Sequence, residues 1–150
     1  MSDIGYMGNP NLKRIGEPIE WTPEMLEEYV KCSEDPVYFA KKYIKIVHVD
    51  RGFIPLEMYP YQEEITKKIF DHRRVAVLTS RQAGKTTTAV AVILHYVLFN
   101  TYKSVALLAN KGDSSQEIMS RFQLAYEALP KWLQQGVLNW NKRSVELENG

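Results

Sequence analysis

The stretch that decides the fold is VAVLTSRQAGKTT, residues 75–87. It begins with a short apolar run typical of a buried parallel strand, continues through a polar loop, and ends at residues that open a helix. Gly84-Lys85-Thr86 matches the end of the phosphate-loop pattern G-x-x-x-x-G-K-[ST], whereas Thr79 stands where that pattern has its first glycine. The motif is partial, and its setting between a predicted strand and a predicted helix supports it.

The residues of this loop suit a bound polyphosphate. Backbone N–H groups of the loop and of the helix start supply donors, and Gly84 permits a close backbone approach. The Lys85 ammonium can reach the β- and γ-phosphates, and the Thr86 hydroxyl can ligate Mg²⁺. We predict that the phosphates of a nucleoside triphosphate are bound by Ser80, Gln82, Ala83, Gly84, Lys85, Thr86 and Thr87. The alternative is an ordinary strand-to-helix turn that contains Gly-Lys-Thr by coincidence.

Arg81 lies inside the loop and has two interpretations. A guanidinium at this place can stabilise charge on the γ-phosphate during transfer, as an arginine finger supplied by the same chain. Arg81 and Lys85 are therefore the catalytic candidates. A surface arginine that pairs with a carboxylate explains the same residue equally well, because arginine suits both roles.

Downstream of the loop, helices and strands are predicted to alternate. Residues 85–99 are apolar nearly all round, which predicts a buried helix. Residues 104–109 predict a second buried strand, and residues 115–129 an amphipathic helix that Pro130 ends, with Asp113 or Ser114 as its N-cap. This order predicts an α/β fold with parallel strands and right-handed crossovers.

Upstream of the loop, two helix starts are marked. Thr22-Pro23 and Asp35-Pro36 each combine an N-cap residue with proline at the first helical position. A third helix is predicted over residues 61–71, and residues 46–49 are expected to be extended, with a loop marked by Gly52 and Pro55. The apolar face of the third helix consists of Tyr61, Ile65 and Ile69.

The two ends of the chain differ in character. Residues 1–20 are rich in glycine and proline and predict an irregular N-terminal arm. At the other end, Val145 and Leu147 alternate with polar residues, and Asn149-Gly150 is a strong hairpin signal. Because no strand returns after it, we expect the 150 residues to be part of a longer protein, with residues 21–150 as one portion of a domain.

Composition excludes little. The net charge of +1 neither requires nor excludes a nucleic acid, and the basic run of residues 67–74 is typical of a solvated helix end. Cys32 is the only cysteine, so no internal disulfide forms, which fits a reducing compartment. The longest apolar stretch has about 12 residues, whereas a membrane span needs about 20.

The loop Ser80-Arg81-Gln82-Ala83-Gly84-Lys85-Thr86-Thr87 resembles the variant Walker A motif of the large terminase subunit of T-even-like tailed phages. That family replaces the first glycine and carries an arginine early in the loop, which accounts for Thr79. The resemblance extends over about residues 21–150, including residues 35–39, 45–48, 51–55, 109–112, 128–130 and 140–147. It implies a P-loop NTPase with a mostly parallel sheet flanked by helices, of which residues 21–150 are the N-terminal portion.

The resemblance implies an ATP-driven motor that moves double-stranded DNA into a procapsid, with a nuclease domain in a C-terminal region. Its cofactors would be ATP and Mg²⁺, with Lys85 on the phosphates, Thr86 on Mg²⁺ and Arg81 as the arginine supplied in cis. Its partners would be double-stranded viral DNA, the portal protein and the small terminase subunit. It would form a homo-oligomeric ring on the portal, in the host cytoplasm, with no membrane and no place in the mature virion.

The resemblance also implies two further expectations. Tyr61-Gln62 is similar to an adenine-reading Q-motif, since a glutamine amide can pair with the adenine edge and an aromatic ring can stack on it. Without the resemblance, Gln62 is typical of a solvent-facing helix residue. Hydrolysis also needs an acid that holds Mg²⁺ and a carboxylate that activates water. Residues 104–109 end at Asn110, so those hydrolytic residues are expected outside this chain, in a Walker B strand and beyond.

Three other function classes remain open on sequence alone. A superfamily-two helicase or translocase shares the upstream glutamine and the phosphate loop. A non-motor nucleotide-binding module would use the loop without DNA. A structural adaptor would make Gly84-Lys85-Thr86 a coincidence.

Overall fold

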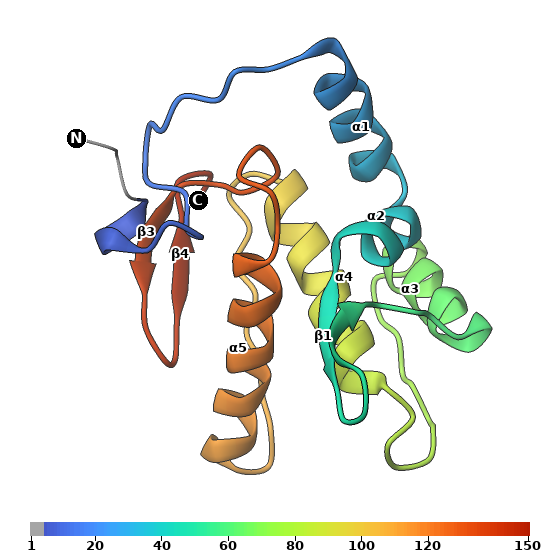
Figure 1. Cartoon of the computed structure of the whole chain (residues 1–150). Coiled ribbons are helices and arrows are strands. Elements are labelled where there is room, and N and C mark those ends of the chain that lie inside the picture. Colours follow the sequence, from blue (N-terminus) through green and yellow to red (C-terminus); the bar gives the residue numbers. More distant parts are fainter. Residues whose placement is uncertain (1–4) are drawn as a thin grey trace.

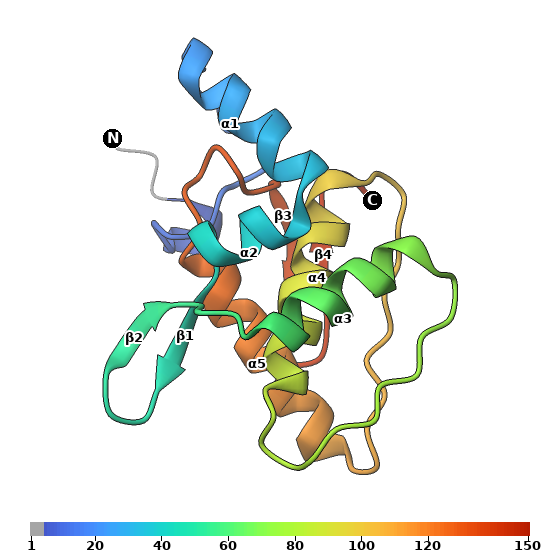
Figure 2. The ribbon, with the colours of Figure 1, turned by 90° about the vertical axis from the view of Figure 1, so that its right-hand side faces the viewer.

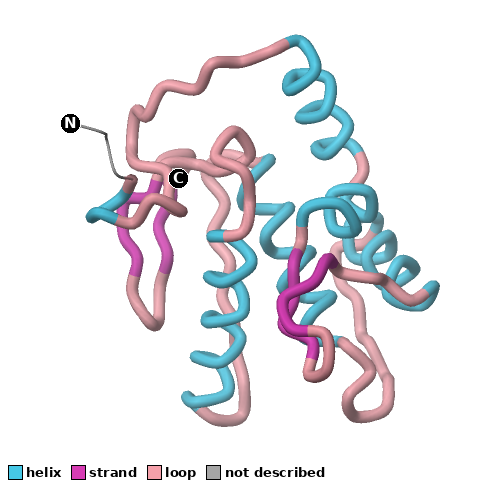
Figure 3. The backbone as a smooth tube through the Cα atoms, viewed as in Figure 1, coloured by secondary structure: helices cyan, strands magenta, loops and turns pink. Residues whose placement is uncertain are grey.

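The computed structural model describes residues 5–150 and shows helices grouped around α4, with two small antiparallel sheets at the sides (Figures 1 and 3). In chain order the elements are a 3₁₀ turn at Tyr6–Gly8, α1 at Pro23–Glu34, α2 at Pro36–Tyr43, β1 at Lys45–His48, β2 at Gly52–Pro55, α3 at Pro60–Asp71, α4 at Lys85–Phe99, α5 at Gly112–Glu127, β3 at Val137–Trp140 and β4 at Val145–Leu147. None of the helices in this described part has both the length and the apolar character needed to cross a membrane.

The two predicted helix starts are confirmed. The Thr22 hydroxyl accepts a hydrogen bond from the Met25 N–H, and proline opens α1 at the next position. The Asp35 carboxylate accepts from the N–H groups of Val37 and Tyr38, and Pro36 opens α2. Each cap satisfies helix-start donors that would otherwise lack a partner.

Helix α4 forms the centre of the core, as its composition predicted. It packs against α2, α3 and α5, and its buried residues lie on several sides of the helix. Those residues are Thr88, Val90, Ala91, Val92, Leu94, His95 and Leu98. Each apolar side chain removed from water stabilises the fold by roughly 1.5–3 kcal/mol when fully buried. This burial fixes the helix that begins at the end of the loop.

A second set of contacts joins α1 to α4. His95 of α4 lies 2.9 Å, through its Nε2, from the backbone oxygen of Cys32 at the end of α1. Burial lowers the pKa of His95 and raises that of the Cys32 thiol to about 12, so Cys32 is an unreactive core residue. Trp21 and Trp132 contact each other edge to face, and Trp132 contacts Tyr43 in the same way, which assigns these tryptophans to packing.

The described part of the N-terminal arm lies against the C-terminal region. Leu12 is buried in the core, and the Lys13 carbonyl accepts a hydrogen bond from the Val137 N–H. The buried Gln134 amide donates to the backbone oxygens of Asn11, Tyr126 and Leu129. These bonds hold an irregular segment in place without regular secondary structure.

The prediction of a loop around Gly52 and Pro55 is wrong, because residues Gly52–Pro55 form strand β2. Strands β1 and β2 pair in antiparallel fashion, with His48 opposite Gly52 and Lys45 opposite Pro55. The turn between them is closed by the N–H groups of Asp50 and Arg51, which donate to His48 Nδ1. Gly52 has φ +71°, a left-handed conformation that suits glycine at the turn.

The predicted parallel sheet is not present in the described residues. Residues 75–79 and 103–109 run without strand pairing, and Val77, Leu78 and Leu108 are exposed although burial was predicted. A strand exists only through hydrogen bonds to a neighbour, and Figure 1 shows the two segments apart, to either side of α4. The structure is thus α/β in content, with helices and two small antiparallel sheets.

Two further expectations need correction. The buried residues of α3 are Gln62 and Thr66, not the apolar residues Tyr61, Ile65 and Ile69. Gln62 donates to the Thr88 hydroxyl of α4, and Thr66 donates to the Gln62 carbonyl within α3. Helix α5 begins at Gly112, three residues before the predicted start, with Lys111 rather than Asp113 or Ser114 as its N-cap.

Glu28 should make the stability of the fold depend on pH. The Lys42 ammonium lies 2.7 Å from its carboxylate, and the Tyr38 and Tyr43 hydroxyls donate to it at 2.7 and 2.9 Å. Chiefly through the hydrogen bond from Lys42, the pKa of Glu28 is lowered from 4.5 to about 2. A carboxylate with a lower pKa in the folded state stabilises above its unfolded pKa, and this stabilisation is lost as the pH falls.

We therefore expect the free energy of unfolding, measured with urea, to decrease as the pH falls from 4.5 to about 2. The Glu28→Gln variant should show a smaller decrease over the same range, because it has no carboxylate to protonate. An identical pH dependence of the two proteins would contradict this assignment.

Candidate functional site

The loop of residues 79–87 joins the extended segment after α3 to the start of α4 (Figure 2). The backbone N–H groups and the carbonyl groups of this loop differ in their hydrogen bonding. From Ser80 to Thr87, no backbone N–H donates to an acceptor within residues 5–150, and the first helical bond is that from the Thr88 N–H to the Gly84 oxygen. The carbonyls of Thr79, Ser80, Ala83 and Gly84, in contrast, all accept hydrogen bonds. Of the carbonyls of residues 79–84, those of Arg81 and Gln82 accept no hydrogen bond from the described residues, so the loop has more free donors than free acceptors.

Two residues give the loop its curvature. Gln82 has φ +58° and Gly84 has φ +74°, so both lie in the left-handed region. Turns with left-handed residues bring successive N–H groups to one side and form anion-binding concavities. Glycine adopts this conformation freely, whereas glutamine does so at a cost of about 1–2 kcal/mol. The loop therefore holds strain in a shape that suits an anion.

The Lys85 ammonium closes the loop. It donates to the Ser80 carbonyl at 2.8 Å and to the Thr79 carbonyl at 3.2 Å. These bonds place a positive charge beside the free N–H groups and draw the first residues of the loop toward the start of α4. The predicted phosphate residues 80 and 82–87 thus lie together in one turn that Lys85 closes.

The first turn of α3 contacts the loop from outside. Tyr61 donates its hydroxyl to the Ala83 oxygen at 2.6 Å. Gln62 donates through Nε2 to the Gly84 oxygen at 3.2 Å and to the Thr88 hydroxyl at 3.1 Å, and its Oε1 accepts from the Tyr59 N–H. Gln62 is 3% exposed. Its amide is therefore used inside the fold and is not directed to solvent, contrary to the solvent-facing reading.

Thr88 is a site residue that sequence reasoning missed. It is buried, and its hydroxyl donates to the Gly84 oxygen at 2.9 Å while accepting from Gln62. A threonine one position beyond the motif carries no signal in a single sequence. Only the packing of α3 on α4 brings its hydroxyl to the end of the loop.

The two remaining site candidates are free to meet a ligand. The Thr86 hydroxyl makes no hydrogen bond within the described part of the chain, which fits the role of a Mg²⁺ ligand. Arg81 is exposed and forms no ion pair with any carboxylate of residues 5–150. The second reading of Arg81, a surface arginine paired with a carboxylate, is thus not what this structure shows. No cluster of His, Cys, Asp or Glu in these residues could hold a metal by itself.

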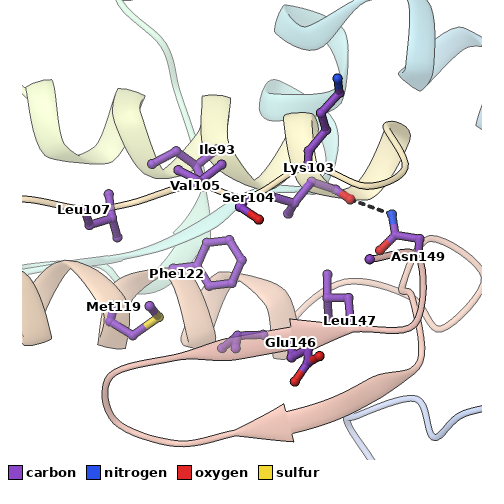
Figure 4. Close-up of a pocket in the computed structure, with 13 residues that line it drawn as sticks. Ile93, Lys103, Ser104, Val105, Leu107, Met119, Phe122, Glu146, Leu147 and Asn149 are labelled. Carbon is purple, nitrogen blue, oxygen red and sulfur yellow. Dashed lines mark hydrogen bonds between the residues drawn. The ribbon is translucent and has the colours of Figure 1, made fainter.

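Three cavities lie away from residues 79–86, and one of them, of about 540 Å³, lies between residues 105–107, α5 and the β3–β4 turn. A cavity of about 340 Å³ lies between α4, α5, β4 and residues 103–107, and its apolar lining includes Ile93, Met119 and Phe122 (Figure 4). Another, of about 290 Å³, lies between β1, α4 and α5 and reaches Thr87. None of these three cavities is lined by residues 79–86.

Comparison with known families adds one finding. A family model described as the N-terminal part of the T4likevirus-type large terminase subunit matches residues 76–150. The matched stretch contains the loop, α4, α5 and the β3–β4 hairpin, whereas α3 with Tyr61 and Gln62 precedes it.

Replacing Gly84 by alanine should destabilise the chain. Its left-handed φ costs any other residue about 1–2 kcal/mol, and an added Cβ would lie 2.5 Å from Gln62 Nε2. We expect the free energy of unfolding in urea to fall by at least about 1 kcal/mol. Gly112→Ala is the control, since no heavy atom lies within 4 Å of its Cβ position. Equal losses in both variants would argue against this geometry.

Proposed function

The chain belongs to the family of T4likevirus-type large terminase subunits, and on that premise we propose that its loop at residues 79–87 binds the triphosphate of ATP for a DNA-packaging motor. Family membership supports a role in phage DNA packaging. The observation that carries the nucleotide proposal is the row of N–H groups from Ser80 to Thr87 without protein acceptors, beside the ammonium of Lys85. Such an arrangement stabilises a multiply charged anion.

Each loop residue has a defined part in the proposed mechanism. The N–H groups of residues 80–87 donate to the phosphate oxygens, and Lys85 exchanges its contacts with the Thr79 and Ser80 carbonyls for contacts with the β- and γ-phosphates. Thr86 would hold Mg²⁺ through its hydroxyl, and the ion would supply neutralisation of phosphate charge. Arg81 stabilises the charge that develops on the γ-phosphate during transfer.

The wider assignment follows the same family premise. We propose that the motor couples ATP hydrolysis to the movement of double-stranded DNA into a procapsid, together with the portal protein and the small terminase subunit. It works as a homo-oligomeric ring on the portal in the host cytoplasm. A nuclease activity in a C-terminal region of the packaging subunit cuts the DNA.

The same proposal extends to the fold. We propose that residues 75–78 and 104–109 become strands of a P-loop sheet when further strands of the packaging subunit pair with them. The exposure of Val77, Leu78 and Leu108 and the unpaired backbone of both segments support this step. An uncovered row of apolar side chains and free backbone groups is a template for strand pairing.

The Lys85→Ala variant should bind MgATP at least about tenfold more weakly in isothermal titration. A hydrogen bond to a charged group is worth about 1.5–3 kcal/mol, and this variant removes the ammonium that supplies it. Lys142→Ala, an exposed lysine in the β3–β4 turn, should bind as the native chain does. Unchanged binding by Lys85→Ala would favour the structural adaptor instead.

A second measurement separates a motor from a non-motor nucleotide-binding module. ATP hydrolysis by the complete packaging subunit should increase on addition of double-stranded DNA. In Arg81→Ala the DNA-stimulated kcat should fall by roughly a thousandfold or more while ATP affinity stays close to native. A full kcat in this variant would refute the catalytic role of Arg81, and hydrolysis indifferent to DNA would favour the module.

A further inference from the structure

The carbonyls of the loop that face α3 are held by two side chains of that helix. The Tyr61 hydroxyl bonds to the Ala83 oxygen, and the Gln62 amide bonds to the Gly84 oxygen, which also accepts from the N–H and the hydroxyl of Thr88. These two donors, Tyr61 and Gln62, are called the carbonyl clamp below. Neither the Tyr61 hydroxyl nor the Gln62 amide oxygen accepts a hydrogen bond from an N–H group of the loop, so the clamp leaves those N–H groups free.

The geometry of the peptide unit gives this arrangement a consequence. In a trans peptide unit, the C=O of one residue and the N–H of the next point in opposite directions. The described peptide bonds are all trans. Holding the Ala83 oxygen toward α3 therefore directs the Gly84 N–H away from α3. Holding the Gly84 oxygen does the same for the Lys85 N–H, and neither N–H has an acceptor within residues 5–150.

We propose that Tyr61 and Gln62 are positioning residues that aim the Gly84 and Lys85 amides at the bound phosphates by holding the opposite ends of the same peptide units. The inference rests on the proposed function, because the amides need a phosphate to receive them. It assigns the clamp to the phosphate end of the nucleotide. Both hydrogens of Gln62 Nε2 donate to the loop end, to the Gly84 oxygen and the Thr88 hydroxyl, while Oε1 accepts one bond, from the Tyr59 N–H.

The clamp is itself held in place. Thr66 donates its hydroxyl to the Gln62 carbonyl at 2.8 Å, and both residues are buried. The Tyr59 ring stacks on the Tyr61 ring, with 5.6 Å between centroids and 6° between planes. An ion pair between Lys41 and Glu63 joins α2 to the same turn of α3. Donors fixed in this way hold the loop without a new loss of side-chain freedom.

The chain supplies matched controls for a purely structural role. Gln134 is also a buried glutamine whose amide donates to backbone carbonyls, those of Asn11, Tyr126 and Leu129. Tyr126 also donates its hydroxyl to a backbone carbonyl, that of Gln135. Both lie outside the loop contacts. Their truncation removes the same kinds of hydrogen bond without touching the phosphate loop.

The test compares affinities for inorganic triphosphate and for ATP, each with Mg²⁺, by isothermal titration of the full chain. Measurements are made below the melting temperature of every variant. Tyr61→Phe removes one exposed hydroxyl and should weaken both ligands about threefold, and Gln62→Leu about tenfold. Tyr126→Phe and Gln134→Leu should lower the melting temperature and bind both ligands as the native chain does.

Nuclear magnetic resonance spectra report directly on the Gly84 and Lys85 amides. In ¹⁵N-labelled chain, triphosphate should move the Gly84 and Lys85 amide proton resonances downfield, and this shift should be smaller in Tyr61→Phe. Native affinities and native amide shifts in both clamp variants would overturn the proposal. A loss of affinity for ATP alone, with native affinity for triphosphate, would also overturn it and would instead favour recognition of adenine by Tyr61 and Gln62. A native chain that binds neither ligand would instead refute phosphate binding itself.

Discussion

Helix α4 is covered by α2, α3 and α5, and the position of the loop depends on this burial. Leu94 and Leu98 are almost completely enclosed, and Thr88 in the second turn is buried against Gln62. Because protein interiors are closely packed, the first turn of such a helix cannot move without opening the core. The later end of the loop is therefore fixed by apolar packing. Its first end follows an exposed segment and is tied back by Lys85 alone.

Much of the helical part of the fold could be predicted from sequence because its signals are local. Thr22-Pro23 and Asp35-Pro36 begin helices wherever they can cap them, and the apolar run of residues 85–99 has few other uses than burial. The loop was found for the same reason, since its glycine, lysine and threonine lie next to one another. Those neighbouring residues mark the loop in the sequence, whereas its contacts with Tyr61 and Gln62 of α3 are seen only in the structure.

The parts that could not be predicted depend on contacts between distant residues. The buried side of α3 is polar, because Gln62 bonds to Gly84 and Thr88 at the start of α4 and Thr66 bonds to the Gln62 carbonyl within α3, and no apolar period marks such a face. Thr88 joined the site for the same reason. Residues 75–78 and 104–109 have the composition of buried strands, yet composition does not supply the neighbour that a strand needs. The β1–β2 hairpin was missed because its turn is closed by His48 and not by an Asn-Gly pair.

The contacts of Lys85 with the Thr79 and Ser80 carbonyls hold the loop curved through the chain's own hydrogen bonds. A cradle that exists in advance requires little ordering of the chain when it is filled, so association loses little conformational entropy. For sites of this kind, related ligands differ mainly in how slowly they depart. On the proposed function, the exchange of a spent diphosphate for a fresh triphosphate is then governed by the residence time of the product and not by the folding of a lid.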